Sequence, residues 1–111
     1  MTMTTPGPVD ARIIQDHHGL EVHPSVVFKR KREYFTLLNH AKWLVHVKFP
    51  TLPIDPREAD IEPGRDKTFT ILDPEPGVYY YVVELTITDE RKITFTLRAR
   101  GGSDPRIIID Y

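Results

Sequence analysis

Prolines and glycines cut this chain into short runs in which apolar and polar residues alternate, a pattern that leaves little room for helices. The clearest run is 92–100, where polar residues separate Ile93, Phe95, Leu97 and Ala99. Side chains point alternately to the two faces of a β-strand, so this run predicts a strand with one buried and one solvated face. No window of about eleven residues has the apolar spacing of three and four that a helix requires. The pattern predicts an all-β fold.

The same alternation recurs along the chain. Strands are expected at 11–15, 20–28 with a break at Pro24, 33–39, 43–49, 68–71, 78–88 and 106–110. Residues 89–91 are expected to close a hairpin. Residues 50–66 differ because they hold four prolines, which exclude a long helix and a central strand. We expect this stretch to connect two sheets, with at most one helical turn at 57–60.

Aromatic residues are expected to fill the core. The apolar residues of the strand at 43–49 share one face, and we expect Trp43 to be the central core residue. Two of the three tyrosines at 79–81 are expected to bury one face of their strand. A tyrosine near a sheet corner commonly donates a hydrogen bond to nearby backbone, as in immunoglobulin-type sandwiches.

The length of 111 residues fits one domain. We expect a flexible leader over 1–10 and a single domain over 11–111. Seven or eight short strands in about 100 residues predict a two-sheet β-sandwich, antiparallel with mixed edges. An immunoglobulin-like arrangement is the near alternative.

Composition narrows the function classes. The formal net charge of −1 predicts no general attraction to nucleic acid or to a membrane surface. The absence of cysteine excludes disulfides, thiolate metal sites and cysteine nucleophiles. No apolar run reaches the roughly eighteen residues of a membrane-spanning helix. The chain begins at Met1 without a secretory signal, so we expect a cytoplasmic protein.

Three places in the chain together resemble one family. They are the apolar strand 35–39 followed by 43–47, the turn 62–64 followed by the alternating 68–71, and Pro76-Gly77-Val78-Tyr79-Tyr80-Tyr81. In this order and spacing they resemble the cupredoxin-like β-sandwich, the fold of small blue-copper proteins. The resemblance covers roughly residues 20–85 and implies that scaffold.

The copper ligands of that family are missing. The resemblance places Val83 at the position of the ligand cysteine and Thr86 at that of a ligand histidine. No methionine follows, and only His46 lies near a matching ligand position. Blue copper needs a thiolate and two imidazoles, so the resemblance implies a scaffold without a type 1 copper site and without a cofactor.

The histidines are also candidates for a rearranged metal site. The candidates are His17, His18, His23, His40 and His46. A pair at 17 and 18 in a turn is expected to diverge. His40 and His46 are about 20 Å apart if the strand is fully extended. No recurrent ligand spacing is present, so exposed or partly packed histidines are the expected outcome.

Two segments are candidates for contact with a partner. The basic run consists of Lys29, Arg30, Lys31 and Arg32. It fits a solvated turn, or a contact with an acidic protein face such as the acidic stretch at 55–66 of another copy. The last predicted strand contains Arg106 and Ile108 and is expected to lie at a sheet edge, and such edges pair with other chains.

No nucleophile elbow, phosphate loop or dinucleotide-binding glycine pattern is present, so we expect no enzyme. The expected function is a structural or protein-interaction module that binds a protein partner or itself. A metal-binding or electron-transfer protein with a histidine site is one alternative. A small-ligand or glycan-binding sandwich that uses Trp43 or the tyrosines is another.

Overall fold

The computed structural model describes residues 8–16, 19–88, 90–92, 94–99 and 104–110, with the side chain of residue 95 left aside. These residues form twelve strands and no helix, which confirms the all-β fold. The strands are β1 Ala11–Asp16, β2 Gly19–His23, β3 Val26–Lys29, β4 Tyr34–Asn39, β5 Val45–Lys48, β6 Ile54–Asp55, β7 Glu58–Ile61, β8 Asp66–Ile71, β9 Gly77–Tyr80, β10 Val82–Thr88, β11 Thr94–Arg98 and β12 Arg106–Ile109.

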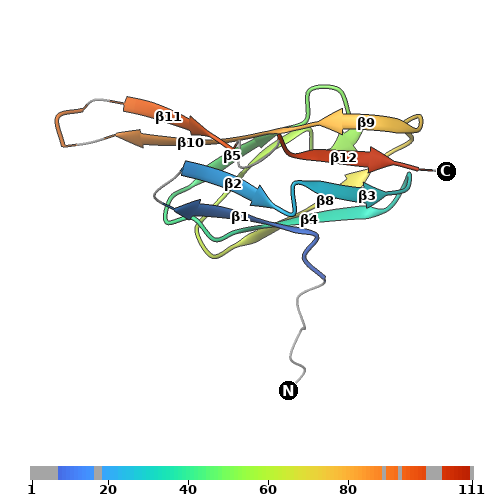
Figure 1. The fold of residues 1–111 in the computed structure, drawn as a ribbon, viewed down its shortest axis with the longest axis horizontal. Helices are drawn as coiled ribbons and strands as arrows, with labels where there is room; N and C mark the ends of the chain where they lie inside the picture. Colours follow the sequence, from blue (N-terminus) through green and yellow to red (C-terminus); the bar gives the residue numbers. More distant parts are fainter. Residues whose placement is uncertain (1–7, 17–18, 89, 93, 100–103, 111) are drawn as a thin grey trace, which may run out of the picture.

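The strands form a sandwich-like arrangement of two layers (Figure 1). One layer is a five-stranded sheet with the order β2-β1-β4-β8-β6. The other contains a four-stranded sheet, β11-β10-β5-β7, and a three-stranded sheet, β3-β12-β9. Most pairs are antiparallel, but β1 pairs with β4 and β12 with β3 in parallel, as the mixed prediction allowed.

The predicted number of seven or eight strands is wrong, because several expected strands are divided. The expected strand at 78–88 breaks at Tyr81, after which the chain passes from the sheet of β12 to the sheet of β5. The backbone N–H of Tyr81 donates to the carbonyl of Pro105, and its side chain is buried. A break near Pro24 likewise separates β2 from β3. Beyond it Val27 is buried and Phe28 is exposed.

The proline-rich stretch contributes two short strands at sheet margins. β6 ends the five-stranded sheet and β7 ends the four-stranded sheet, so residues 50–66 do run between the layers. No helical turn forms at 57–60, where the sequence allowed one at most, since Glu58–Ile61 make up β7 and pair with β5. Ile61 at the end of β7 is buried, and the strand pairing satisfies backbone groups that a single helical turn would leave open.

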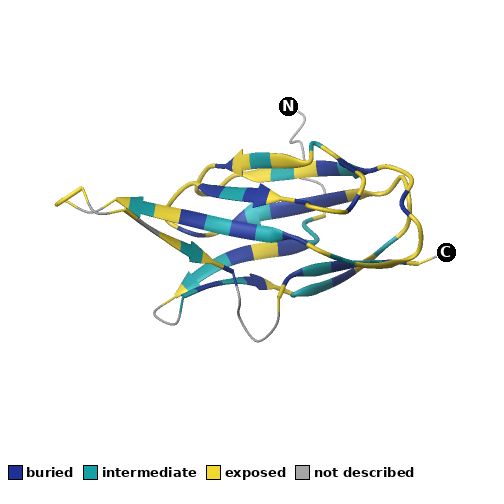
Figure 2. Ribbon diagram, turned by 90° about the horizontal axis from the view of Figure 1, so that it is seen from above, coloured by how far each residue is buried: buried dark blue, intermediate teal, exposed yellow. Residues whose placement is uncertain are grey.

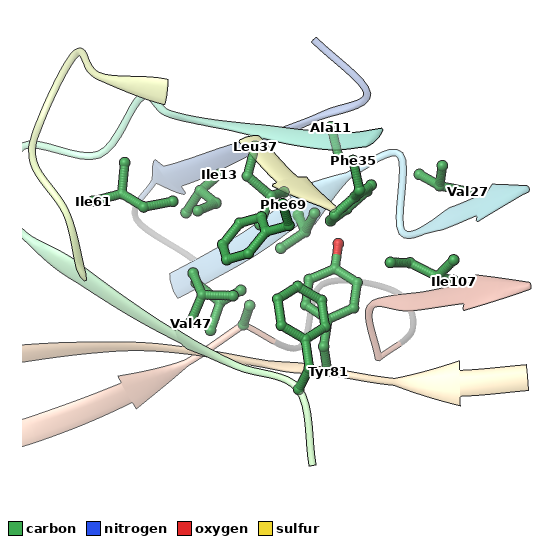
Figure 3. Packing of buried hydrophobic residues seen from close by; sticks show 14 of the residues in the cluster. Ala11, Ile13, Val27, Phe35, Leu37, Val47, Ile61, Phe69, Tyr81 and Ile107 are labelled. Atoms are coloured by element: carbon green, nitrogen blue, oxygen red, sulfur yellow. The ribbon is translucent and has the colours of Figure 1, made fainter. Parts of the chain in front are cut away.

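Four aromatic side chains form the centre of the core (Figure 3). Phe49 lies 4.9 Å from Phe69 and 5.2 Å from Tyr81 between ring centroids, and Phe35 lies 5.6 Å from Tyr81. The prediction that Trp43 is the central core residue is wrong. Trp43 precedes β5 and is 41% exposed, because these four rings already fill the space between the layers.

Alternation along the strands otherwise follows the predicted pattern. Val45 and Val47 are fully buried and Phe49 nearly so, while His46 and Lys48 point to the other face. Figure 2 shows the same change between buried and exposed segments along the long strands. The buried face of β5 was therefore predictable from the alternation of its residues.

A buried asparagine joins the end of β4 to the loop that follows it and to the end of β7. The Asn39 side chain has no exposed surface, and its Nδ2 donates to the carbonyls of Trp43 and Ile61, each at 2.9 Å. Its Oδ1 accepts from the Ala41 N–H at 2.8 Å. These bonds fix the loop between β4 and β5 against the end of β7.

The described part of the leader is attached to the domain. The backbone N–H of Asp10 donates to the carbonyl of Thr36, and its carboxylate accepts from the Thr36 N–H at 2.8 Å. The same carboxylate lies 2.8 Å from Lys29 Nζ. Residues 1–7 lie outside the described part. The described residues include no helix long and apolar enough to cross a membrane.

Candidate interaction surface

The last strand, β12, lies in the middle of its sheet and sets the register of both neighbours. Ile108 is opposite Phe28 on β3 and opposite Val78 on β9. Two residues earlier on the same face, Arg106 is opposite Val26 on β3 and Tyr80 on β9. Because Val27, Ile107 and Ile109 are buried, these six residues point away from the core. We call this surface the β12 face: Val26, Phe28, Val78, Tyr80, Arg106 and Ile108.

The β12 face is apolar although it lies on the solvent side of the sheet. Phe28 is 69% exposed, Tyr80 53% and Val78 51%, and the other three residues are half-buried. The outer face of an exposed antiparallel sheet is ordinarily polar. Scattered exposed apolar residues need no explanation, whereas apolar residues grouped on one face are a candidate interaction site.

The neighbouring four-stranded sheet carries the ordinary polar outer face. A row across it contains Arg98, Glu84, His46 and Asp60 on successive strands. The Glu84 carboxylate lies 3.7 Å from Arg98 and 3.9 Å from Lys48 Nζ. One layer of this small domain therefore holds a charged outer face beside an apolar one, so the apolar character of the β12 face is not a general property of its surface.

Arg106 is the charged residue of the β12 face, and its position is held by two contacts. Its guanidinium carbon lies 5.8 Å from the centroid of the Tyr80 ring, within the range of a cation–π interaction. Its Nη1 donates to the carbonyl of Asp104 at 3.5 Å. Tyrosine and arginine are enriched where protein surfaces meet, because each combines a large contact area with a polar group.

The prediction that the last strand offers a free sheet edge is wrong. β12 pairs with β3 on one side and with β9 on the other, so its backbone groups are already used. The strand that closes the chain took the central place because its inward isoleucines, Ile107 and Ile109, are both buried in the core. Arg106 and Ile108 remain candidate contact residues through their side chains on the β12 face.

The basic run forms the predicted turn, with Lys31 and Arg32 at its centre. Lys29 is largely buried and paired with Asp10, whereas Lys31 lies 3.7 Å from Asp73 on the surface. The Arg30 backbone N–H donates to the Glu33 carboxylate at 2.6 Å. The four residues therefore do not present one uniform cationic patch.

The histidines are not assembled into one site within the described residues. His40 Nε2 lies 3.1 Å from Arg12 Nη1 on the five-stranded sheet, and His23 is exposed at the end of β2. His17 and His18 lie outside the described residues. Across the ranges that the structure describes, no group of three or more histidine or acidic side chains is arranged to hold a metal ion.

His46 is held by two carboxylates on the charged outer face. Its Nδ1 lies 2.6 Å from Asp60 Oδ1, and its Nε2 lies 3.4 Å from Glu58 Oε2. The hydrogen bond to Asp60 raises the pKa of His46 above its ordinary value, against the opposing effect of partial burial. The His46 ring thus links the edge strand β7 to β5.

The positions that the resemblance assigns to copper ligands do not converge. Val83 is buried in the core and pairs with Val47. Thr86 is exposed on the outer face of β10, and His46 lies on the same outer face of β5. One of the three positions thus points inward and two point outward.

The tyrosines divide as expected. Tyr81 is buried, Tyr79 packs against the core, and the Tyr79 hydroxyl donates to the Glu75 carbonyl four residues upstream at 2.6 Å. Tyr80 is exposed and borders a cavity of about 360 Å³ that is also lined by Arg98, Asp104 and Pro105.

Sequence reasoning missed the β12 face as a surface. Its members come from three strands that are far apart in the sequence, and only the pairing of β12 with β3 and β9 brings them together. The available signal was a set of three successive isoleucines in one short strand. Because successive side chains alternate between the faces, at least one of them must point away from the core. No protein-family model matches this chain, and no curated protein matches it either.

Proposed function

We propose that this domain is a non-enzymatic protein-interaction module on a cupredoxin-like scaffold without a type 1 copper site, and that it binds its partner through the β12 face. The observation that carries the proposal is the continuous apolar surface made by Phe28, Val78 and Tyr80 around Ile108. The two-layer arrangement, with β2–β3 and β9–β10 each passing between sheets, supports the scaffold assignment.

The energy of covering this face favours a partner. Complete burial of a large apolar side chain contributes roughly 1.5–3 kcal/mol. Phe28, Val78 and Tyr80 each retain at least half of their exposure, so covering all three contributes a few kcal/mol. Arg106 adds a charged contact at one end of the surface. This combination of aromatic and aliphatic residues with one arginine is typical of the residues that dominate protein interfaces.

Photo-crosslinking tests this assignment. A photoreactive amino acid is placed at Phe28 on the β12 face and, as a matched control, at Thr86 on the outer face of β10. After irradiation in native lysate, adducts are identified by mass spectrometry. We expect crosslinked partner adducts from position 28 and none of these from position 86. Adding the substitution Tyr80→Lys should abolish the adducts from position 28. Equal labelling from both positions would contradict the proposal. Circular dichroism shows whether each variant is folded.

A second candidate function is small-ligand binding beside Tyr80. The cavity of about 360 Å³ combines an exposed ring with Arg98 and the backbone around Asp104. Aromatic rings with nearby polar groups suit a sugar or another planar-faced polar ligand. NMR titration with a carbohydrate panel tests this candidate. Shifts confined to Tyr80 and Arg98 favour it, and an unchanged spectrum removes it.

A further inference from the structure

We infer that the partner bound by the β12 face is a second copy of this chain, packed face to face about a two-fold axis that crosses β12 at Ile108. This inference rests on the function proposed above and names the partner. It comes from the order of charges along β12.

The outward positions of β12, together with the residue that follows it, are self-complementary. Arg106, Ile108 and Asp110 follow one another at every second residue, so a cation and an anion stand at equal distances on either side of an apolar residue. Ile107 and Ile109 are buried between them. The Asp110 backbone N–H donates to the Lys29 carbonyl at 3.0 Å, so the pairing of β12 with β3 continues to Asp110, which is exposed.

A two-fold axis that lies between the two stacked faces, perpendicular to the strands, makes use of this order of charges. It places Ile108 against the partner's Ile108, and Arg106 against the partner's Asp110 at both ends of the contact. Phe28 and Val78 lie level with Ile108, so each also faces its own equivalent. Stacked sheets are about 10 Å apart, a distance that an arginine and an aspartate reach across together.

The other two-fold axis that would stack the two faces runs parallel to β12, and the charges disfavour it. An axis parallel to β12 places Arg106 against the partner's Arg106 and Asp110 against the partner's Asp110. Like charges that are partly removed from water repel each other and select against that arrangement. The perpendicular axis is therefore the one that satisfies both the apolar row and the charges.

The size of the face predicts a weak dimer. Three strands at about 4.8 Å spacing and five residues at about 3.3 Å give a footprint of roughly 14 by 16 Å. Even after allowance for rough side chains, this is well below the roughly 800 Å² per partner of a stable interface. We therefore expect association only at high protein concentration.

The experiment is sedimentation velocity with ¹H–¹⁵N NMR spectra over a wide concentration range. The wild type should show a concentration-dependent mass, with shifts at Phe28, Val78 and Ile108. Arg106→Glu alone and Asp110→Arg alone should each weaken association at least tenfold, since each places two like-charged pairs in the dimer. An equimolar mixture of the two variants should associate again, because the introduced groups then face each other. Thr86→Glu, on the outer face of β10, should leave association unchanged.

Three results would overturn the inference. One is a wild type that stays monomeric, with unchanged spectra, up to the highest concentration reached. The second is association that the mixture of variants fails to restore. The third is association that Thr86→Glu weakens as strongly as Arg106→Glu does. Crosslinks from position 28 to a different protein, found with a monomeric wild type, would leave the proposed function standing while removing this inference. The amide spectra of each variant show that it is folded.

Discussion

The most instructive perturbation is Tyr81→Phe, which we expect to leave the protein as stable as the wild type or more stable. Tyr81 is 2% exposed, and its hydroxyl is buried without a hydrogen-bond partner among the residues that the structure describes. Figure 3 shows this hydroxyl directed into the aromatic core. Burial, with a smaller contribution from the Asp10 carboxylate, raises the pKa of the Tyr81 hydroxyl, so it stays protonated in the folded protein.

The magnitude follows from two opposing effects. An unsatisfied buried hydroxyl costs about 1–3 kcal/mol, which the phenylalanine variant recovers. Loss of one oxygen leaves a void smaller than a methyl group, which costs up to about 1 kcal/mol. The ring contacts with Phe35 and Phe49 are unchanged. The expected change is a gain of about 1 kcal/mol in the free energy of unfolding, or about 4 °C in Tm.

Urea unfolding, followed by the fluorescence of the single tryptophan, measures this change. Tyr79→Phe is the matched control: its hydroxyl donates to the Glu75 carbonyl, so the same chemical change should cost about 1 kcal/mol. A folded pKa above the unfolded value also means that stability is full below pH about 10 and falls as pH rises beyond it. Tyr81→Phe should reduce that alkaline fall. A loss of 1 kcal/mol or more in Tyr81→Phe would refute the reasoning, because the hydroxyl would then have a partner such as an ordered water.

Three further predictions concern other parts of the molecule. Asn39→Ala removes three hydrogen bonds of a buried side chain and should lower the free energy of unfolding by about 3 kcal/mol in urea titrations; a loss below about 1 kcal/mol would contradict their role. Asp60→Asn should lower the pKa of His46 in NMR titrations, and an unchanged pKa would show that the contact is not formed. Since the folded pKa of His46 is raised, its stabilisation is full below pH about 6.5 and is lost as pH rises through the folded pKa. Phe28→Thr should change thermal stability by less than about 0.5 kcal/mol, whereas a large loss would place Phe28 in the core.

Local pattern was sufficient to predict the all-β fold and, where the alternation was regular, the buried face of a strand. The inward positions of β5, the turn after β3 and the hairpin between β10 and β11 all follow from alternation and turn residues. A hydrogen bond from a tyrosine hydroxyl to nearby backbone, as Tyr79 donates to the Glu75 carbonyl, was also expected near a turn. These features depend on neighbours in the chain, because strand geometry alone makes successive side chains point to opposite faces.

The candidate site depended on contacts between distant residues. β12 was expected at an edge and lies at the centre, the strand at 78–88 divides at Tyr81, and Trp43 lies at the surface. Each outcome was decided by competition for the same core space and the same pairing positions. Alternation indicates that a strand has two faces, but it does not say which strands lie beside it. Only the pairing of β12 with β3 and β9 joined six separate residues into one apolar surface, because adjacency across a sheet is a property of the folded chain.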